Sequence, residues 1–130
     1  MLTIPIAKAR SFASIICVEA DPDIHRILQE NLKQNGCTRV RTICCVVSNI
    51  DHQLIPFYRT PRESFGMGSI GPQFNVTPVM LKQMSVDTLL GNMNIDRVDV
   101  IKIDVEGAEA CVLQGGAKVA EIETVTGCGF

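Results

Sequence analysis

The sequence predicts an α/β fold with a mostly parallel sheet and flanking helices. Short apolar runs of strand length alternate with segments of helical spacing, which is the order expected of such a fold. The runs are continuous rather than alternating, as in strands that are buried on both faces. Two of the runs end in a carboxylate, at Glu19 and at Asp104. With 130 residues, the chain is long enough for one domain with a single core.

The first half of the chain predicts a strand, a helix and a second strand. Residues 15–19, Ile-Ile-Cys-Val-Glu, form a continuous apolar run that suits a buried parallel strand. Asp21 as N-cap and Pro22 at the first helical position then begin a helix. Its apolar stripe consists of Ile24, Ile27, Leu28 and Leu32. Asn35-Gly36 ends the helix with a left-handed C-cap, and residues 39–48 form the second strand.

The second half begins with a long loop over residues 59 to 78, where glycine and proline interrupt any periodicity. We expect a strand over residues 79–84 and a short helix from Val86 to Met93. Val98 to Ile103, which ends at Asp104, is the clearest strand that the sequence predicts. Gly107 to Gln114 is predicted to be helical and is followed by two glycines.

Charge and composition exclude several classes of protein. Twelve basic and fourteen acidic residues leave a formal charge of −2, without the clustered basic face that nucleic acid requires. The sequence contains no apolar run of roughly 18 residues that could span a bilayer. Lys8 and Arg10 make the first residues a poor signal peptide. The six cysteines include no C-x-x-C pair, so we expect no zinc site and a reducing, cytoplasmic location.

Glu19 is a candidate cofactor-binding residue because of its place at the end of a strand. Parallel sheets bind ligands at the carboxyl ends of their strands. A carboxylate there can accept hydrogen bonds from both hydroxyls of an adenosine ribose. The alternative is an ordinary strand-end acid that helps to cap the following helix, and position alone leaves both open.

Asp104 and Glu106 stand where the clearest strand gives way to a helix, together with Glu109. Capping is one explanation, because acids in a first turn interact favourably with the helix dipole by about 0.3–1 kcal/mol each. Capping does not account for Lys102, which interrupts the apolar run. A buried ammonium needs a partner, so we expect Lys102 to reach a carboxylate at the strand end.

The glycines argue against a nicotinamide oxidoreductase. Such a fold needs a glycine-rich turn about 20 residues before the ribose-binding acid, and no glycine precedes Glu19 in this sequence. A literal G-x-G-x-x-G occurs at residues 66–71, but it follows no clean strand, and Pro72 and Pro78 disfavour an amphipathic helix after it. We interpret it as a chance match.

Taken together, these segments resemble the FkbM family of methyltransferases. The resemblance rests on residues 18–22, Asn35-Gly36 and residues 85–89, and above all on residues 100–109, Val-Ile-Lys-Ile-Asp-Val-Glu-Gly-Ala-Glu. It covers roughly residues 6 to 117. The resemblance implies a Rossmann-like class I methyltransferase sheet, S-adenosyl-L-methionine as methyl donor, and transfer to a hydroxyl oxygen of a small or glycosyl acceptor.

The same resemblance implies roles for individual residues. Glu19 and the adjacent Ala20 would bind the ribose, and Val46 and Val47 would lie near the adenine. Asp104 would face the methyl donor and the acceptor, and it is the first candidate for a catalytic role, with Glu106 as the second. Either carboxylate could accept the proton of the attacking hydroxyl.

The sequence departs from the family pattern at both ends. The first strand and its glycine-rich loop are not found before residues 4–10, and the last strands of the sheet are missing. We therefore expect an incomplete domain over residues 1–120 and an unassigned tail over residues 121–130. The sheet edges left open predict self-association. Two hypotheses follow: a methyltransferase, in a truncated form, or a non-catalytic remnant that depends on a partner.

Overall fold

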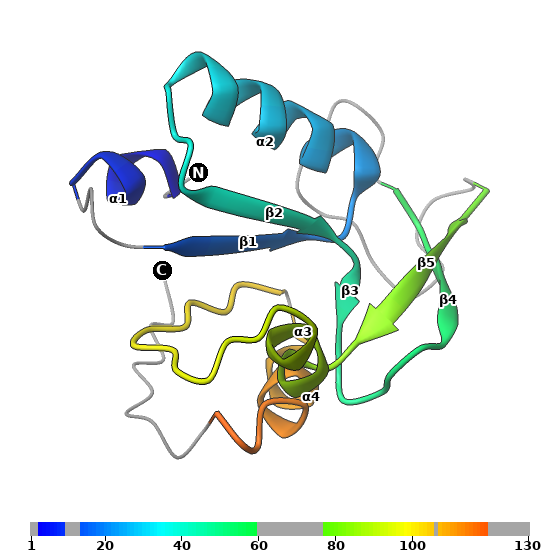
Figure 1. Cartoon of the computed structure of the whole chain (residues 1–130). Coiled ribbons are helices and arrows are strands. Elements are labelled where there is room, and N and C mark those ends of the chain that lie inside the picture. The colour runs from blue at the N-terminus through cyan, green and yellow to red at the C-terminus, as the bar shows by residue number, and fades with distance from the viewer. Residues whose placement is uncertain (1–2, 10–13, 60–76, 106, 120–130) are drawn as a thin grey trace. The chain divides into compact units, whose positions relative to one another are not determined.

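The computed structural model describes residues 3–9, 14–59, 77–105 and 107–119 (Figure 1). The chain divides into two units, one formed by Met1–Val46 with Phe57–Val79 and the other by Val47–Pro56 with Met80–Phe130. The elements in chain order are α1 (Thr3–Ala9), β1 (Ile15–Glu19), α2 (Pro22–Gln34), β2 (Val40–Cys44), β3 (Val46–Val47), β4 (Leu54–Phe57), β5 (Val79–Met84), α3 (Val86–Asn92) and α4 (Glu109–Gln114).

The first unit is built on the parallel pair β1–β2. The register joins Ile15 to Val40 and Glu19 to Cys44, so the two strands end side by side. Figure 1 shows α2 running along this pair, and Leu28 and Leu32 are the buried residues of the helix. Parallel pairing with a helical crossover confirms the α/β prediction for this part of the chain.

Local signals fix both ends of α2. The Asp21 side chain accepts hydrogen bonds from the backbone N–H groups of Asp23 and Ile24, and proline occupies the first turn. At the other end Gly36 has a φ of 66°. Its N–H donates to the Lys33 carbonyl at 3.2 Å, and the Cys37 N–H donates to the Leu32 carbonyl at 3.0 Å. This pair of bonds is a Schellman motif, which confirms the predicted left-handed cap.

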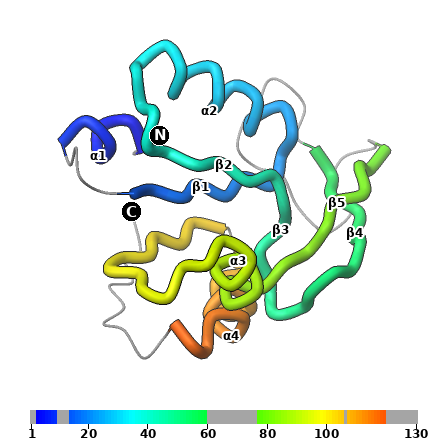
Figure 2. Tube along the Cα trace, viewed as in Figure 1, coloured from blue at the N-terminus to red at the C-terminus, as the bar shows by residue number. Residues whose placement is uncertain are grey.

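A second sheet has the strand order β3-β5-β4. The strand predicted over residues 39–48 is in fact interrupted at Cys45, which bends the chain between β2 and β3. β5 confirms the strand predicted over residues 79–84. β4 was not predicted, since it is short and contains Pro56. Figure 2 follows the trace through these strands.

A β-bulge joins β4 to β5. His52 has a φ of 62°; its N–H donates to the Gln83 carbonyl at 3.0 Å, and the Gln83 N–H donates to the Gln53 carbonyl at 2.7 Å. Two residues of one strand thus oppose one residue of the other, as in a G1 bulge, with histidine where glycine is usual. Directly before the bulge, the Asp51 carboxylate accepts bonds from the Ser85 N–H at 2.7 Å and from the Ser85 hydroxyl at 3.0 Å.

Ser85 and Gly115 position the helices of the second unit. Ser85 is the N-cap of α3, and its hydroxyl accepts a bond from the Thr88 N–H at 3.1 Å. Gly115 follows α4 and lies so close to β3 that a Cβ there would collide with the carbonyl oxygen of Ser48. Both helices agree with the predictions to within two residues at each end.

The strand predicted over Val98–Ile103 is wrong. The segment is irregular, and Val100 is 72% exposed. None of its amides donates to a backbone carbonyl within the described residues. A strand exists only through its ladder of hydrogen bonds, so an apolar run without a pairing partner in the described chain does not become one.

Within the described residues, no helix is long and apolar enough to cross a membrane.

Candidate functional site

Glu19 ends β1 with its carboxylate held in place. Its Oε1 accepts a hydrogen bond from the Asp21 N–H at 2.9 Å, and the residue is half-buried. A carboxylate has about four acceptor positions, so one backbone bond leaves capacity for hydroxyl donors. Glu19 therefore matches both readings of the sequence: it orients the turn into α2, and it can still accept hydrogen bonds from a ligand.

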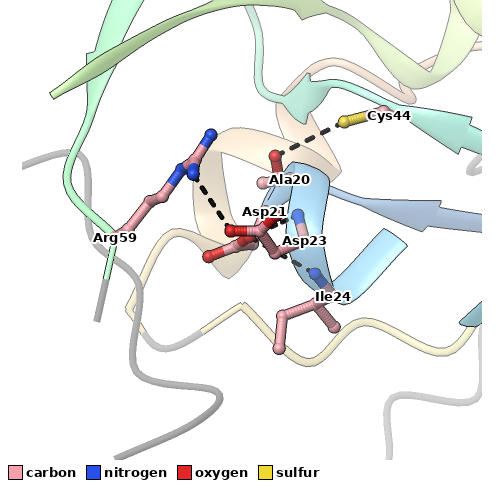
Figure 3. A network of polar contacts seen from close by, with 6 residues as sticks. All are labelled: Ala20, Asp21, Asp23, Ile24, Cys44 and Arg59. Carbon is pink, nitrogen blue, oxygen red and sulfur yellow. Dashed lines mark hydrogen bonds and ion pairs between the residues drawn. The ribbon is translucent and has the colours of Figure 1, made fainter. Parts of the chain in front are cut away.

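A polar network lies beside this turn at the start of α2 (Figure 3). Asp21 Oδ1 accepts bonds from the N–H groups of Asp23 at 2.8 Å and Ile24 at 3.4 Å. Arg59 Nη1 donates to Asp23 Oδ2 at 3.0 Å. The Nε of Arg59 is buried and has no hydrogen-bond partner among the described residues. The guanidinium thus holds the chain after β4 against the helix start.

Cys44 and Ala20 complete the end of the parallel pair. The Cys44 thiol donates to the Ala20 carbonyl at 3.6 Å, as drawn in Figure 3. Partial burial raises the pKa of the Cys44 thiol, the carboxylates of Glu19 and Asp21 raise it further, and Arg59 opposes them. The thiol is therefore protonated at neutral pH, which excludes it as a thiolate nucleophile.

Val46 and Val47 form β3, directly after the bend at Cys45. Val46 is 9% exposed, and Val47 is half-buried. Both are apolar, and Val47 keeps more exposed surface than Val46.

Asp104 lies in the second unit, on the irregular segment that replaces the predicted strand. Lys102 Nζ donates to Asp104 Oδ2 at 2.6 Å, which confirms that the lysine reaches a carboxylate. The expected burial is wrong, because the side chains of Lys102 and Asp104 are 49% and 78% exposed. The hydrogen bond from Lys102 and its charge hold the pKa of Asp104 below its ordinary value.

Among the acids of this block, Glu109 binds the turn that precedes α4, whose N-cap Ala108 has no side-chain hydrogen bond. The Glu109 carboxylate accepts bonds from the Gly107 N–H at 3.2 and 3.0 Å, one to each oxygen. Bonds from its own N–H and from Gly107 lower the pKa of Glu109. Glu106 lies outside the described residues, as does the G-x-G-x-x-G at residues 66–71.

The family model for the Methyltransferase FkbM domain matches residues 6–127. The chain belongs to the FkbM methyltransferase family. The match begins at the same residue as the resemblance seen in the sequence and continues past residue 117. No curated protein and no solved structure matches the chain.

Within the FkbM domain, the structure gathers Glu19 and Ala20 with two residues that sequence reasoning missed. Cys44 could have been found from the register, because the ends of parallel neighbours coincide. Arg59 gave no local signal, since its place depends on the unpredicted strand β4. Asp104 is brought together with Lys102 in the other unit.

Proposed function

We propose that this FkbM domain is an S-adenosyl-L-methionine-dependent methyltransferase that acts on a hydroxyl oxygen of a small or glycosyl acceptor. The observation that carries the proposal is the Glu19 carboxylate, which a backbone N–H fixes at the carboxyl end of β1 inside the family match. Parallel sheets bind ligands at this end of their strands.

The residues of the first unit suit the adenosine portion of the cofactor. Glu19 would accept hydrogen bonds from the ribose hydroxyls, with Ala20 providing the adjacent backbone. Val46, which also belongs to the first unit, would offer an apolar surface to the adenine. S-adenosyl-L-methionine supplies an activated methyl group when bound; the protein's part is to hold the donor and the acceptor in line.

Asp104 would position the acceptor rather than remove its proton. Because Lys102 lowers the pKa of Asp104, this carboxylate is ionised at neutral pH and is a weak base. An ionised carboxylate accepts a hydrogen bond from a hydroxyl and so orients the attacking oxygen. Glu106 is then the candidate for accepting the proton as the new bond forms.

One observation favours the alternative of a non-catalytic remnant. The segment that carries Asp104 makes no strand pairing within the described residues, and its acid is largely exposed. Such a polypeptide could bind the cofactor through Glu19 without transferring its methyl group. Alternatively, it could need a partner for both cofactor binding and methyl transfer.

The test is a calorimetric titration of the full chain with S-adenosyl-L-methionine. We expect saturable binding that Glu19→Ala weakens at least about tenfold, as expected from loss of charge-assisted hydrogen bonds worth about 1.5–3 kcal/mol. Glu30→Ala is the matched control, because it removes an exposed carboxylate that pairs with Arg26 on the surface of α2. A folded chain that does not bind the cofactor would overturn the proposal.

A second measurement separates the two candidate functions. Methyl transfer from labelled cofactor is followed over a panel of hydroxyl acceptors, with wild type beside Asp104→Asn. Product formation that Asp104→Asn reduces supports the enzyme. Binding without transfer to any acceptor supports the remnant.

A further inference from the structure

One hydrogen-bond donor of Arg59 is buried without an acceptor. Arg59 follows β4 in the first unit, and its Nη1 donates to Asp23 Oδ2 at 3.0 Å (Figure 3). This ion pair fixes the guanidinium, whose Nε has no hydrogen-bond partner among the described residues. An unsatisfied buried donor costs free energy, so such a group calls for an acceptor that a ligand or a water molecule supplies.

The guanidinium lies beside the ends of the two parallel strands. Glu19 pairs with Cys44 in the register of β1 and β2, so the strands end next to each other. Burial raises the pKa of the Cys44 thiol, the Glu19 and Asp21 carboxylates raise it further, and the charge of Arg59 lowers it. All four residues belong to the first unit. Arg59 thus stands at the same strand ends as the candidate ribose-binding acid.

The inference rests on the proposed function, in which Glu19 binds the ribose and Val46 offers its surface to the adenine. Cys44 stands between these two residues, since it pairs with Glu19 and precedes Val46 by two positions. A cofactor that spans Glu19 and Val46 would therefore bring its base, rather than its ribose, toward Cys44 and Arg59.

The charges around Arg59 favour a neutral acceptor over an anion. Asp23 already pairs with the guanidinium, and the Glu19 and Asp21 carboxylates act on the same strand ends. A carboxylate of the ligand, such as that of its methionine part, would be repelled by these acids. Adenine instead offers uncharged ring nitrogens that accept hydrogen bonds on both of its edges, and arginine is a common donor to purine ring nitrogens.

We propose that Arg59 Nε donates a hydrogen bond to a ring nitrogen of the adenine of S-adenosyl-L-methionine. Glu19 then selects the ribose, and Arg59 selects the base. The ion pair with Asp23 positions the guanidinium for this contact. A base that lacks the accepting nitrogen leaves the buried N–H unpaired, and a site built on hydrogen bonds discriminates strongly against such a ligand.

The experiment is a calorimetric titration of the full chain with S-adenosyl-L-homocysteine, the demethylated cofactor, and with its deaza analogues. In each analogue, one acceptor nitrogen of the adenine ring is replaced by C–H. We expect wild type to bind one of the analogues at least about tenfold more weakly than the parent compound, as for loss of a charge-assisted hydrogen bond. Arg59→Ala should bind that analogue and the parent compound equally, to within about twofold, because coupling requires both partners.

Two further variants separate a direct contact from a structural role. Arg59→Lys keeps a positive charge beside Asp23 but lacks the guanidinium Nε–H, so it should fold and still lose the discrimination between analogues. Arg26→Ala is the matched control, because it removes an exposed arginine of α2 that pairs with Glu30. It should keep both the affinity of wild type and its discrimination. A purely structural role of Arg59 would weaken all compounds by the same factor.

The outcomes distinguish this inference from the proposed function. A folded wild-type chain that does not bind S-adenosyl-L-homocysteine overturns both. Binding that Glu19→Ala weakens, without discrimination between analogues or with equal discrimination in wild type and Arg59→Ala, retains the proposed function and overturns only the role of Arg59. A water molecule would then be the acceptor of the Nε–H.

Discussion

Two apolar runs of this chain end in a carboxylate, and only one of them is a strand. Residues 15–19 pair in parallel with β2 along their whole length, whereas Val98–Ile103 forms no ladder within the described residues. Both runs are rich in β-branched apolar residues, and both end in a carboxylate, so apolar content alone predicts a strand for each. The difference lies in the hydrogen-bond partner, which is supplied by a distant part of the chain.

The carboxylates that end these two runs, Glu19 and Asp104, are also held in different ways. A backbone N–H holds Glu19 at the end of a paired strand. Asp104 is held by the long side chain of Lys102, two positions earlier on the same irregular segment. Fixing an acid through backbone geometry costs less side-chain entropy than fixing it through a lysine. Glu19 is accordingly the better organised of the two candidate site residues.

Amide hydrogen exchange should give the largest contrast. We expect the amides within the β1–β2 ladder to exchange at least about 100-fold more slowly than those of residues 98–103, because only the former are hydrogen-bonded in a ladder. Exchange followed by NMR or mass spectrometry measures this directly. Comparable protection in both segments would mean that residues 98–103 are paired in solution, and the comparison would fail.

Leu28→Ala should weaken the paired region strongly. Leu28 lies on the buried face of α2 and is 6% exposed. Its truncation leaves a cavity and should lower the free energy of unfolding by about 3 kcal/mol. Val100→Ala, at 72% exposed, is the matched control in the other segment and should change it by less than about 0.5 kcal/mol. Urea denaturation followed by circular dichroism measures both. Equal losses would place Val100 in a core.

Asp21→Ala should have a moderate effect, because it removes the N-cap of α2 and leaves two backbone N–H groups without their acceptor. We expect the free energy of unfolding to fall by about 1 kcal/mol. Asp21→Asn keeps an acceptor oxygen and should retain most of the stability. If asparagine costs as much as alanine in the same denaturation experiment, the negative charge and not the cap is what stabilises the helix.

Lys102→Met should have the smallest effect on the free energy of unfolding, but it should clearly change the pKa of Asp104. Without the ammonium, the pKa of Asp104 should rise toward its ordinary value. A carboxyl whose pKa is lowered by folding stabilises the fold above its unfolded pKa and loses that contribution as the pH falls through its folded pKa. The loss should be slight here, since the pair is exposed.

NMR of the Asp104 side-chain carbon over an acid titration tests this shift, with Lys82→Met, which removes an exposed lysine of β5, as control. An unchanged pKa in Lys102→Met would show that the ion pair does not form in solution. The wild-type pKa should stay low in the control.

The features that the sequence predicted correctly depend on neighbours in the chain. Asp21 and Pro22 begin α2 and Gly36 ends it, each through interactions with residues a few positions away. Such signals can be read from a single sequence because the interacting groups are local. The parallel pairing of β1 and β2 followed from the same logic, since a helix between two apolar runs favours a crossover.

The errors concern partners that are far apart. The sequence of residues 98–103 does not indicate that the segment has no hydrogen-bonded neighbouring strand among the described residues. The sequence around Pro56 does not indicate that β4 is an edge strand, which can contain a proline. In the candidate site, strand-end position predicted Glu19, but Arg59 reaches Asp23 across 36 positions of sequence. The direction of the pKa shift of Asp104 was likewise not predicted, because it depends on which carboxylate Lys102 binds.

Pro56 has one further consequence, for the growth of the second sheet. β4 is the last strand in the order β3-β5-β4. In the register set by the Gln53–Gln83 bond, Pro56 stands opposite Met80, at a position whose backbone faces away from β5. A neighbouring molecule that tried to extend the sheet there would find no N–H to pair with. Within the described part of the chain the sheet thus ends at β4, whereas β1 and β2 contain no proline that would block pairing along their outer edges.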